Sequence, residues 1–512
     1  MSYAPALPWT AAASWRNLEH LFDGAFGAPL NPLKHLGALA LLMLWLLAGS
    51  GIVLYVMLDT SAQGAFRSID EFSRERFGPG SLLRGVHRYA ADAFVVLTLA
   101  HLVREWVLGR YRTFRRFSWL TGVPLVPLAF VCGIGGFWLN WDRLGQFSAV
   151  ATAEWLDALP FLASPLARNF LGGAVSDRLF SLFVFVHLGV PLLMVFGLWF
   201  HIQRISRATV FPPRALALGS SVALLALALA WPVHSQGPAD LALVPESLSL
   251  DWFLLFLHPL TDATSPGATW AGVAAVLAGL FALPFLRPPV RPAVAVVDPA
   301  HCNGCRRCVE DCPYAAITMA PHPSGRHGLQ LAVVDPVLCA SCGICVGSCP
   351  SSTPFRGATT LATGIDMPQW PIDALRRRLR SDLAAASGVQ PTVVFGCDCA
   401  ARVQTLAAPG VLAYSLPCSG MLPPAFVEYA LRAGAAQVVV AGCRPGGCEF
   451  RLGQRWTAQR LAGAREPRLR AGVDGARWRT VWADAGDEAA VRAALRPPPG
   501  RSQLSIRAEV GA

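Results

Sequence analysis

The sequence predicts a multi-domain protein: an all-α transmembrane bundle of about six helices, then a small α+β domain, then a small α/β domain with a parallel sheet. Three observations support this. Six apolar runs, each long enough to cross a bilayer, precede residue 287. All of the 14 cysteines except Cys132 lie after residue 300, in close clusters. Short β-type runs flank a helical run after residue 390.

The composition narrows the class of protein. At 54% hydrophobic and 15% charged residues, the chain is too apolar to be wholly soluble. The net charge of +11 comes almost entirely from arginine, since Lys34 is the only lysine. We interpret this as a compositional preference and expect no nucleic-acid binding. Clustered cysteines indicate metal ligation in a reducing compartment rather than disulfides.

The membrane part begins after an amphipathic segment, 1–33, that we expect to lie on the membrane surface. The six runs lie near 34–57, 86–107, 119–139, 180–203, 214–232 and 252–286. The last run is interrupted, so only 268–286 needs to cross, with 250–260 re-entrant or at the surface. Arginines gather in the loops after the second, fourth and sixth runs. The positive-inside rule therefore predicts a multi-pass protein of the inner (cytoplasmic) membrane, with both termini and the cysteine-rich part in the cytoplasm.

Two of these runs each carry a pair of histidines fourteen residues apart. His87 and His101 lie in the second run, and His187 and His201 in the fourth. Fourteen residues return to nearly the same helix face and advance by about 21 Å along the axis. Two such helices offer two imidazole pairs at two depths, and each pair can hold one haem. The alternative, four buried structural histidines, is weaker because polar groups inside a bilayer are costly.

With these histidines, residues 30–286 resemble the cytochrome b of quinol-oxidising cytochrome bc complexes. The resemblance implies two b haems, with His87 paired to His187 near the outer face and His101 paired to His201 near the cytoplasm. Its haem-packing glycines correspond to Gly37, Gly51, Gly122 and Gly136. Glycine lets a helix backbone approach a macrocycle closely. Arg84 and Arg104 correspond to family positions near haem propionates.

The resemblance divides the membrane part into a four-helix di-haem domain, 34–211, and a two-helix region, 212–286. The second region is similar to the separate quinol-site subunit of photosynthetic relatives. Where that subunit has Pro-Glu-Trp-Tyr in its outer quinol pocket, this chain has Leu-Asp-Trp-Phe, which includes Asp251 and Trp252. Asp251 then takes the place of the glutamate as proton acceptor for quinol, although it is shorter. A helix N-cap is the alternative role for Asp251.

A Pro-rich linker, 287–300, leads to a domain at 301–358 with two C-x2-C-x2-C-x3-C-P runs. The first run holds Cys302, Cys305, Cys308 and Cys312, and the second holds Cys339, Cys342, Cys345 and Cys349. They resemble bacterial two-cluster ferredoxins and imply two 4Fe–4S clusters. In that family the fourth cysteine of each run ligates the other cluster, so Cys349 joins the first three cysteines and Cys312 joins the second three. Zinc is the alternative metal.

The last domain, 385–465, has strand-like runs at 393–395, 411–416 and 437–442, with a helical run before the third. Its cysteines follow the strand ends, where loops of a parallel sheet converge. Four thiolates there suit a 2Fe–2S cluster, with zinc as a weaker competitor. The region resembles the delta subunit of methyl-viologen-reducing hydrogenase, which implies a cytoplasmic flavin-containing partner of the heterodisulfide-reductase type. The expected ligands are Cys418, Cys443, Cys448 and either Cys397 or Cys399.

Residues 466–512 are predicted to be a weakly ordered tail with one short helix. Together, these parts predict a membrane-bound electron-transfer protein, a subunit of a quinone-linked oxidoreductase complex of a respiratory chain. Quinone is the expected substrate, and a homodimer is expected by analogy with cytochrome b. Two alternatives stay open: a redox-responsive docking or scaffold subunit, and an outer-face quinol oxidase component with a Rieske partner.

Overall fold

The computed structural model describes residues 9–160, 165–171, 175–244, 247–286, 293–325, 327–357, 359–386 and 390–496. The chain forms two compact units. One contains residues 18–203 and 208–288, and the other contains the rest. The first eight residues, residues 287–292 of the predicted linker and the final sixteen residues of the predicted tail lie outside the described residues.

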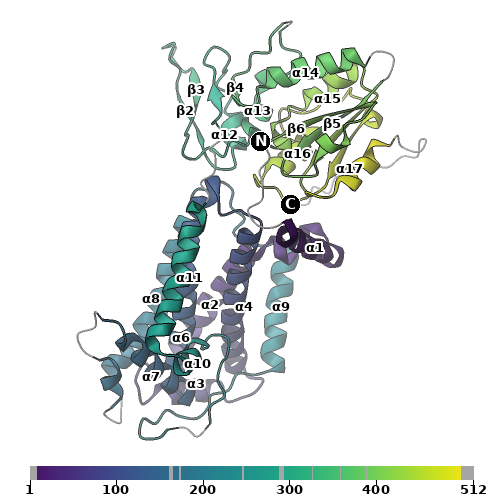
Figure 1. The fold of residues 1–512 in the computed structure, drawn as a ribbon. Helices are drawn as coiled ribbons and strands as arrows, with labels where there is room; N and C mark the ends of the chain where they lie inside the picture. The colour runs from purple at the N-terminus through teal and green to yellow at the C-terminus, as the bar shows by residue number, and fades with distance from the viewer. Residues whose placement is uncertain are drawn as a thin grey trace. The chain divides into compact units, whose positions relative to one another are not determined.

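The first unit is a helical bundle, as predicted (Figure 1). Its long helices are α2 (Leu36–Met57), α4 (Pro79–Val107), α5 and α6 (Arg116–Gly122, Leu125–Asn140), α8 (Asp177–Ile202), α9 (Arg214–Ala230) and α11 (Pro266–Ala282). Among the described residues, four helical stretches are long and apolar enough to span a membrane: 36–57, 116–140, 177–202 and 266–285. Ser176 and Ser265 cap α8 and α11 through side-chain oxygens.

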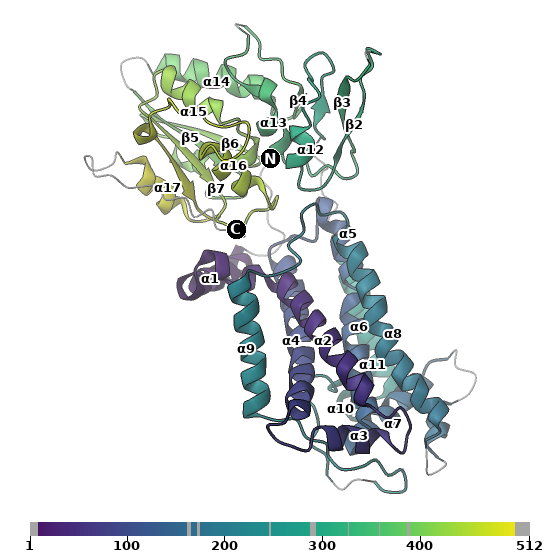
Figure 2. The same ribbon diagram turned by 180° about the vertical axis from the view of Figure 1, so that it is seen from behind.

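The bundle is built around two helix pairs, α2 with α4 and α6 with α8 (Figure 2). Their shared core includes Met43, Phe94, Ala129 and Met194. Short helices, α3 (Ala65–Phe72), α7 (Arg143–Asp157) and α10 (Leu257–Ala263), lie between the long ones. An N-terminal helix, α1 (Trp9–Phe26), occupies most of the predicted amphipathic segment.

The second unit begins with a small α+β region. Two antiparallel strand pairs, β1 (Val296–Val297) with β4 (Ile365–Asp366) and β2 (Ile317–Pro321) with β3 (Gln330–Val334), accompany the short helices α12 (Arg307–Asp311) and α13 (Ile344–Ser348). The two cysteine runs share a backbone pattern. Gly304 and Arg306 have positive φ in the first, and Ser341 and Gly343 have positive φ at the same places in the second. The sequence repeat is therefore also a structural repeat.

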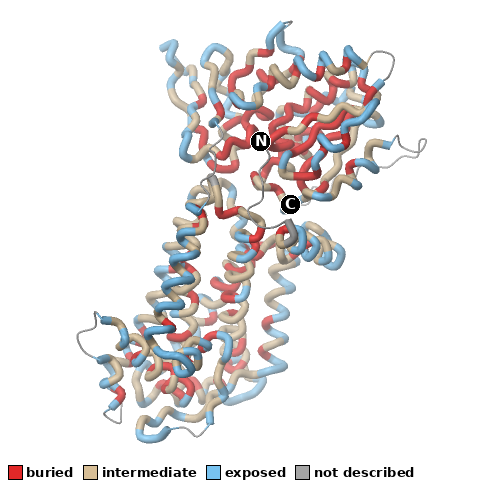
Figure 3. Tube along the Cα trace, in the orientation of Figure 1, coloured by how far each residue is buried: buried red, intermediate tan, exposed pale blue. Residues whose placement is uncertain are grey.

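An α/β domain follows, with a four-stranded parallel sheet in the order β6-β5-β7-β8. Its strands are β5 (Thr392–Cys397), β6 (Val411–Leu416), β7 (Gln437–Gly442) and β8 (Trp478–Trp482), and its helices are α14 (Ile372–Ala385), α15 (Ala425–Arg432), α16 (Gly453–Leu461) and α17 (Glu488–Leu495). Strands β5 and β7 are buried along almost their whole length (Figure 3). The three predicted strands coincide with β5, β6 and β7.

Residues 466–496 differ from the predicted tail. Strand β8 extends the sheet beside β7, with Val440 opposite Thr480, and α17 buries Val491 against it. Sequence analysis missed β8 because it is an edge strand whose five residues are all only half-buried. Its Trp-Arg-Thr-Val-Trp pattern therefore lacks the continuous apolar run that marks the central strands.

Candidate metal centres

Helices α4 and α8 bring the four predicted histidines together in two pairs. The rings of His87 and His187 have centroids 6.4 Å apart at an interplanar angle of 62°. His101 and His201 have the same 6.4 Å separation, at 82°. A metal–nitrogen bond is about 2 Å long, so each pair has the spacing of two imidazoles bound to opposite sides of one iron. The residues present fit two bis-histidine haem sites.

Two hydrogen bonds orient the His87–His187 pair. The Nδ1 of His187 donates to the carbonyl oxygen of Cys132 at 3.0 Å. The Nδ1 of His87 lies 2.9 Å from the Ser50 hydroxyl, which itself donates to the Leu46 carbonyl at 2.7 Å. A metal-ligating histidine usually donates its second ring nitrogen in this way, which leaves Nε2 for the metal. Sequence reasoning missed both partners, because a backbone carbonyl has no side-chain signal and Ser50 is one small residue in an apolar run.

Each of the four predicted glycines lies against a different histidine ring. A Cβ added at Gly51 would lie 3.1 Å from Cε1 of His87, and one at Gly136 would lie 3.1 Å from Cε1 of His187. The corresponding contacts to Cε1 atoms are 3.5 Å for Gly37 with His101 and 2.9 Å for Gly122 with His201. Because glycine has no side chain, each of these positions leaves room for the edge of a histidine ring, and not only for a haem macrocycle.

The two predicted propionate arginines have different surroundings. Arg84 donates to three neutral oxygens, those of Ser73, Asn140 and Ser235, at 2.9–3.0 Å. Arg104 is buried, and its Nε donates to Glu19 Oε1 at 2.8 Å. Its Nη2 is buried without a hydrogen-bond partner. An unsatisfied guanidinium nitrogen near His101 of the His101–His201 pair fits an additional anion, such as a haem propionate.

Asp251 and Trp252, the predicted quinol-site residues, lie just before α10. The Asp251 carboxylate pairs with Arg88, which also pairs with Asp92. Asp251 Oδ1 accepts backbone hydrogen bonds from Phe253 at 3.1 Å and Leu254 at 2.7 Å, as a capping residue does. The Trp252 side chain is 71% exposed. Asp251 thus combines cap geometry with an ion pair to Arg88, the residue after the predicted haem ligand His87.

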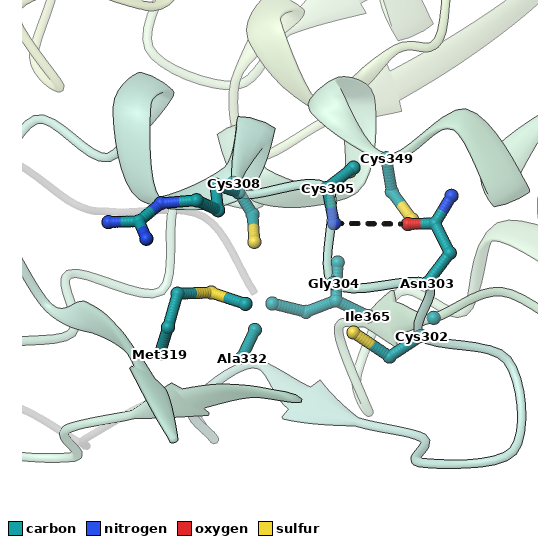
Figure 4. Close-up of a pocket in the computed structure, with 11 residues that line it drawn as sticks. Cys302, Asn303, Gly304, Cys305, Cys308, Met319, Ala332, Cys349 and Ile365 are labelled. Carbon is teal, nitrogen blue, oxygen red and sulfur yellow. Dashed lines mark hydrogen bonds between the residues drawn. The ribbon is translucent and has the colours of Figure 1, made fainter. Parts of the chain in front are cut away.

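The first ferredoxin-type cysteine set surrounds a cavity. Cys302, Cys305, Cys308 and Cys349 line it together with Met319, Ala332 and Ile365 (Figure 4). Burial, with smaller contributions from Cys305, Cys349 and Cys302, raises the pKa of the Cys308 thiol to about 12. Cys308 would become a thiolate only with compensating positive charge, which iron would supply. Cys349, from the second run, belongs to the set of the first run.

The second set contains Cys312 with Cys339, Cys342 and Cys345. Burial raises the pKa of Cys345 well above its usual value, and Cys342, Cys339 and Cys312 add to the effect. Each run thus contributes its fourth cysteine to the other set, the arrangement that the ferredoxin resemblance implies. All eight cysteines are free thiols.

The third set lies at the carboxyl edge of the parallel sheet. Cys397 ends β5, Cys418 and Cys443 follow β6 and β7, and Cys448 comes from the loop before α16. Hydrogen bonds from Cys399, Cys418 and Cys443 hold the pKa of Cys397 well below its usual value. Bonds from Cys418 and Cys443 likewise lower the pKa of Cys448. Cys397, Cys418, Cys448 and Cys443 therefore form a closed ring of thiols.

Cys399 lies outside that ring. Its thiol is hydrogen-bonded to Cys397, and the residue is only half-buried. Cys397 is 2% exposed, and its sulfur lies 3.9 Å from that of Cys443. Of the two candidates for the fourth ligand, the geometry therefore favours Cys397.

Three parts of the chain match known families. Residues 26–209 match the family model of cytochrome b/b6/petB, residues 301–353 match the 4Fe-4S dicluster domain, and residues 393–497 match the delta subunit of methyl-viologen-reducing hydrogenase. A chain of a solved structure described as "Hyperthermophilic respiratory Complex III" is similar at 20% identity, with a TM-score of 0.41, over 54% of this chain and 82% of that chain.

These matches confirm the predicted fusion of a cytochrome b, a dicluster domain and a hydrogenase-delta-like domain. The protein is therefore a membrane protein of electron transfer. The cytochrome b part implies haem, and the dicluster part implies 4Fe–4S clusters. The hydrogenase-type match extends to residue 497, so it includes β8 and α17.

Proposed function

We propose that this protein carries electrons between the membrane quinone pool and a cytoplasmic flavin-containing partner of the heterodisulfide-reductase type. The observation that carries the proposal is the equal spacing of the two histidine pairs on α4 and α8, each with centroids 6.4 Å apart. The same chain carries three thiol sets in its second unit. We find no other chemistry in the described residues that explains five candidate redox sites on one chain.

Each of the five candidate sites holds one redox group. The histidine pairs hold two b haems, the two ferredoxin-type sets hold two 4Fe–4S clusters, and the ring of Cys397, Cys418, Cys443 and Cys448 holds a 2Fe–2S cluster. When bound, these groups accept and release single electrons; the protein positions them and sets their surroundings. Reduction of quinone to quinol consumes two electrons and two protons, and oxidation releases them. The chain therefore passes two electrons, one after the other, for each quinone.

The arginine distribution supports a cytoplasmic position for the second unit, with the inner haem at the His101–His201 pair. The resemblance to cytochrome b supports a homodimer and an inner-membrane location. The hydrogenase-delta-like domain supports docking of the flavoprotein partner on the α/β domain.

Anaerobic affinity purification from membranes, followed by mass spectrometry of co-purifying proteins, tests the proposal. We expect a cytoplasmic flavoprotein with heterodisulfide-reductase-type cysteines. The matched control is a chain that lacks residues 390–512, which should retain both haems and lose the flavoprotein. Recovery of a Rieske protein or a c-type cytochrome in place of the flavoprotein would contradict the proposal.

That contrary result would favour a second candidate function, quinol oxidation at the outer face. The observation in its favour is the Asp251 carboxylate, which pairs with Arg88, the residue directly after the haem-ligand candidate His87. A carboxylate in this place is suited to accept a proton from quinol.

A further inference from the structure

A buried ion-pair network joins the two cysteine-bearing parts of the second unit. Arg460 of α16 is 1% exposed and pairs with Asp311, at the end of α12. It also donates to the Gly420 carbonyl at 2.8 Å and to the Ser348 hydroxyl at 2.7 Å. Arg465 adds a second bond to Asp311, 2.8 Å from its Nε. One arginine of the α/β domain thus binds both short helices of the dicluster region.

Stability alone does not account for this network, because a buried ion pair often stabilises a fold no better than apolar packing of similar volume. Asp311 lies directly before Cys312, and Ser348 lies directly before Cys349. Holding these two residues therefore fixes the backbone beside ligands of both ferredoxin-type sets. This suggests that the role of Arg460 is to position those ligands.

The network holds α13 in close contact with the loops of the third set. A Cβ added at Gly347 would lie 2.1 Å from the Gly420 carbonyl oxygen, so the two backbones pack with no space for a side chain. A Cβ at Gly453 would lie 2.1 Å from Cys418 Sγ, and 3.5 Å from both Cys448 Sγ and Ile344 Cδ1. Ile344 itself is fully buried.

Ile344 lies between Cys342 and Cys345 of the second set in the chain. Its side chain at Gly453 therefore brings the second set close to Cys418 and Cys448 of the third set. The Cys448 thiol is also close enough to Cys342 to act on it electrostatically. The described lining of the cavity at the first set includes Cys302, Cys305, Cys308 and Cys349 and no cysteine of the third set. The second set therefore lies against the third set, and the first set lies on the other side of it.

We propose that Arg460 is a positioning residue that holds the Cys312–Cys339–Cys342–Cys345 centre next to the third centre, and that electrons pass directly between these two. This inference rests on the proposed function and gives its order of transfer: third centre, second set, first set, or the reverse. In each step one centre loses one electron and its neighbour gains it. No covalent bond forms or breaks, and no further reactant is needed.

The order is tested by electron paramagnetic resonance of the full-length protein, purified anaerobically and fully reduced. A paramagnetic neighbour splits or broadens the signal of the third centre. We expect this splitting in the native protein, its loss in Cys339→Ser, and its persistence in Cys305→Ser. Iron and sulfide analysis confirms which centre each variant has lost. Loss of the splitting only in Cys305→Ser would overturn the order.

The role of Arg460 is tested in the same spectra. Arg460→Leu is expected to reduce the splitting at least twofold with iron content unchanged, and Arg460→Lys to restore most of it. The control is Arg468→Leu, since the Arg468 side chain is 65% exposed and pairs only with Glu466 among the ion pairs described. A native third-centre signal without any splitting would overturn this inference and leave the proposed function intact, whereas absence of that signal would contradict both.

Discussion

Gly51 of α2 lies against His87 of α4 so closely that an added Cβ would be 3.1 Å from the imidazole Cε1. Gly49, two residues earlier on the same helix, has nothing within 4 Å of its Cβ position. The two glycines therefore differ in what they do, although both lie in one apolar helix. One makes room for a ligand ring, and the other does not.

We predict that Gly51→Val displaces the His87 ring and lowers outer-haem content by more than half. Gly49→Val is the matched control and should leave both haems at native levels. The measurement is the reduced-minus-oxidised haem spectrum of purified protein, normalised to the inner haem. Equal haem loss in the two variants would show that helix packing, and not the ring contact, is responsible.

Arg104→Gln should lower the midpoint potential of the inner haem. Removing a nearby positive charge disfavours the more negative, reduced state of the haem, so the potential moves to lower values. Arg84 provides the comparison, because its guanidinium donates hydrogen bonds to three neutral oxygens. Arg84→Gln should leave the midpoint potential of the inner haem unchanged. Redox titration of each haem separates the two effects. An inner-haem potential that is the same in Arg104→Gln as in the native protein would refute a propionate contact.

The loss of Arg104 also removes the buried ion pair that it forms with Glu19. Removing one member of a buried pair typically costs about 3–5 kcal/mol. A Glu19→Gln, Arg104→Gln double variant removes both charges and should recover much of that stability, and loss of the negative charge of Glu19 should move the haem potential back toward the native value. Thermal unfolding followed by haem absorbance measures the difference.

Cys397→Ser should abolish the third centre, whereas Cys399→Ser should retain it. Cys397 closes the ring of four thiols, and Cys399 only donates a hydrogen bond to it. Loss of that bond should shift the potential of the centre without removing its iron. Iron content and the third-centre resonance signal distinguish the two variants. Retention of the signal in Cys397→Ser would assign the fourth ligand to Cys399.

Asp251→Asn distinguishes the two candidate functions. If quinol is oxidised at the outer face, this variant should lose at least tenfold in quinol-dependent haem reduction with both haems in place. Asp92→Asn removes the other carboxylate that pairs with Arg88 and keeps the backbone bonds to Phe253 and Leu254, so it controls for the ion pair. Native rates in Asp251→Asn would exclude the outer-face candidate.

The candidate ligand sets could be predicted from the sequence because their spacing repeats. Histidines fourteen positions apart on two helices, and two cysteine runs with the same spacing, are patterns that a single chain reveals. Arg460 and Asp311 give no such signal, since they lie 149 residues apart and become partners only when the two regions pack. The choice between Cys397 and Cys399 also needed the structure, because only burial and sulfur contacts distinguish two cysteines that are two residues apart at the end of β5.

The arrangement of the two helix pairs has a consequence for how the protein is made. Helix α2 supplies both glycines that contact the histidines of α4, whereas α5 and α6 supply those that contact the histidines of α8. Each proposed haem would thus be shared between an early and a late segment of the chain. Neither site would be complete until α8 has been synthesised. In cells starved of haem, the full-length chain should therefore be held together across the two helix pairs by the apolar core alone, and should be digested by membrane proteases faster than the haem-loaded protein.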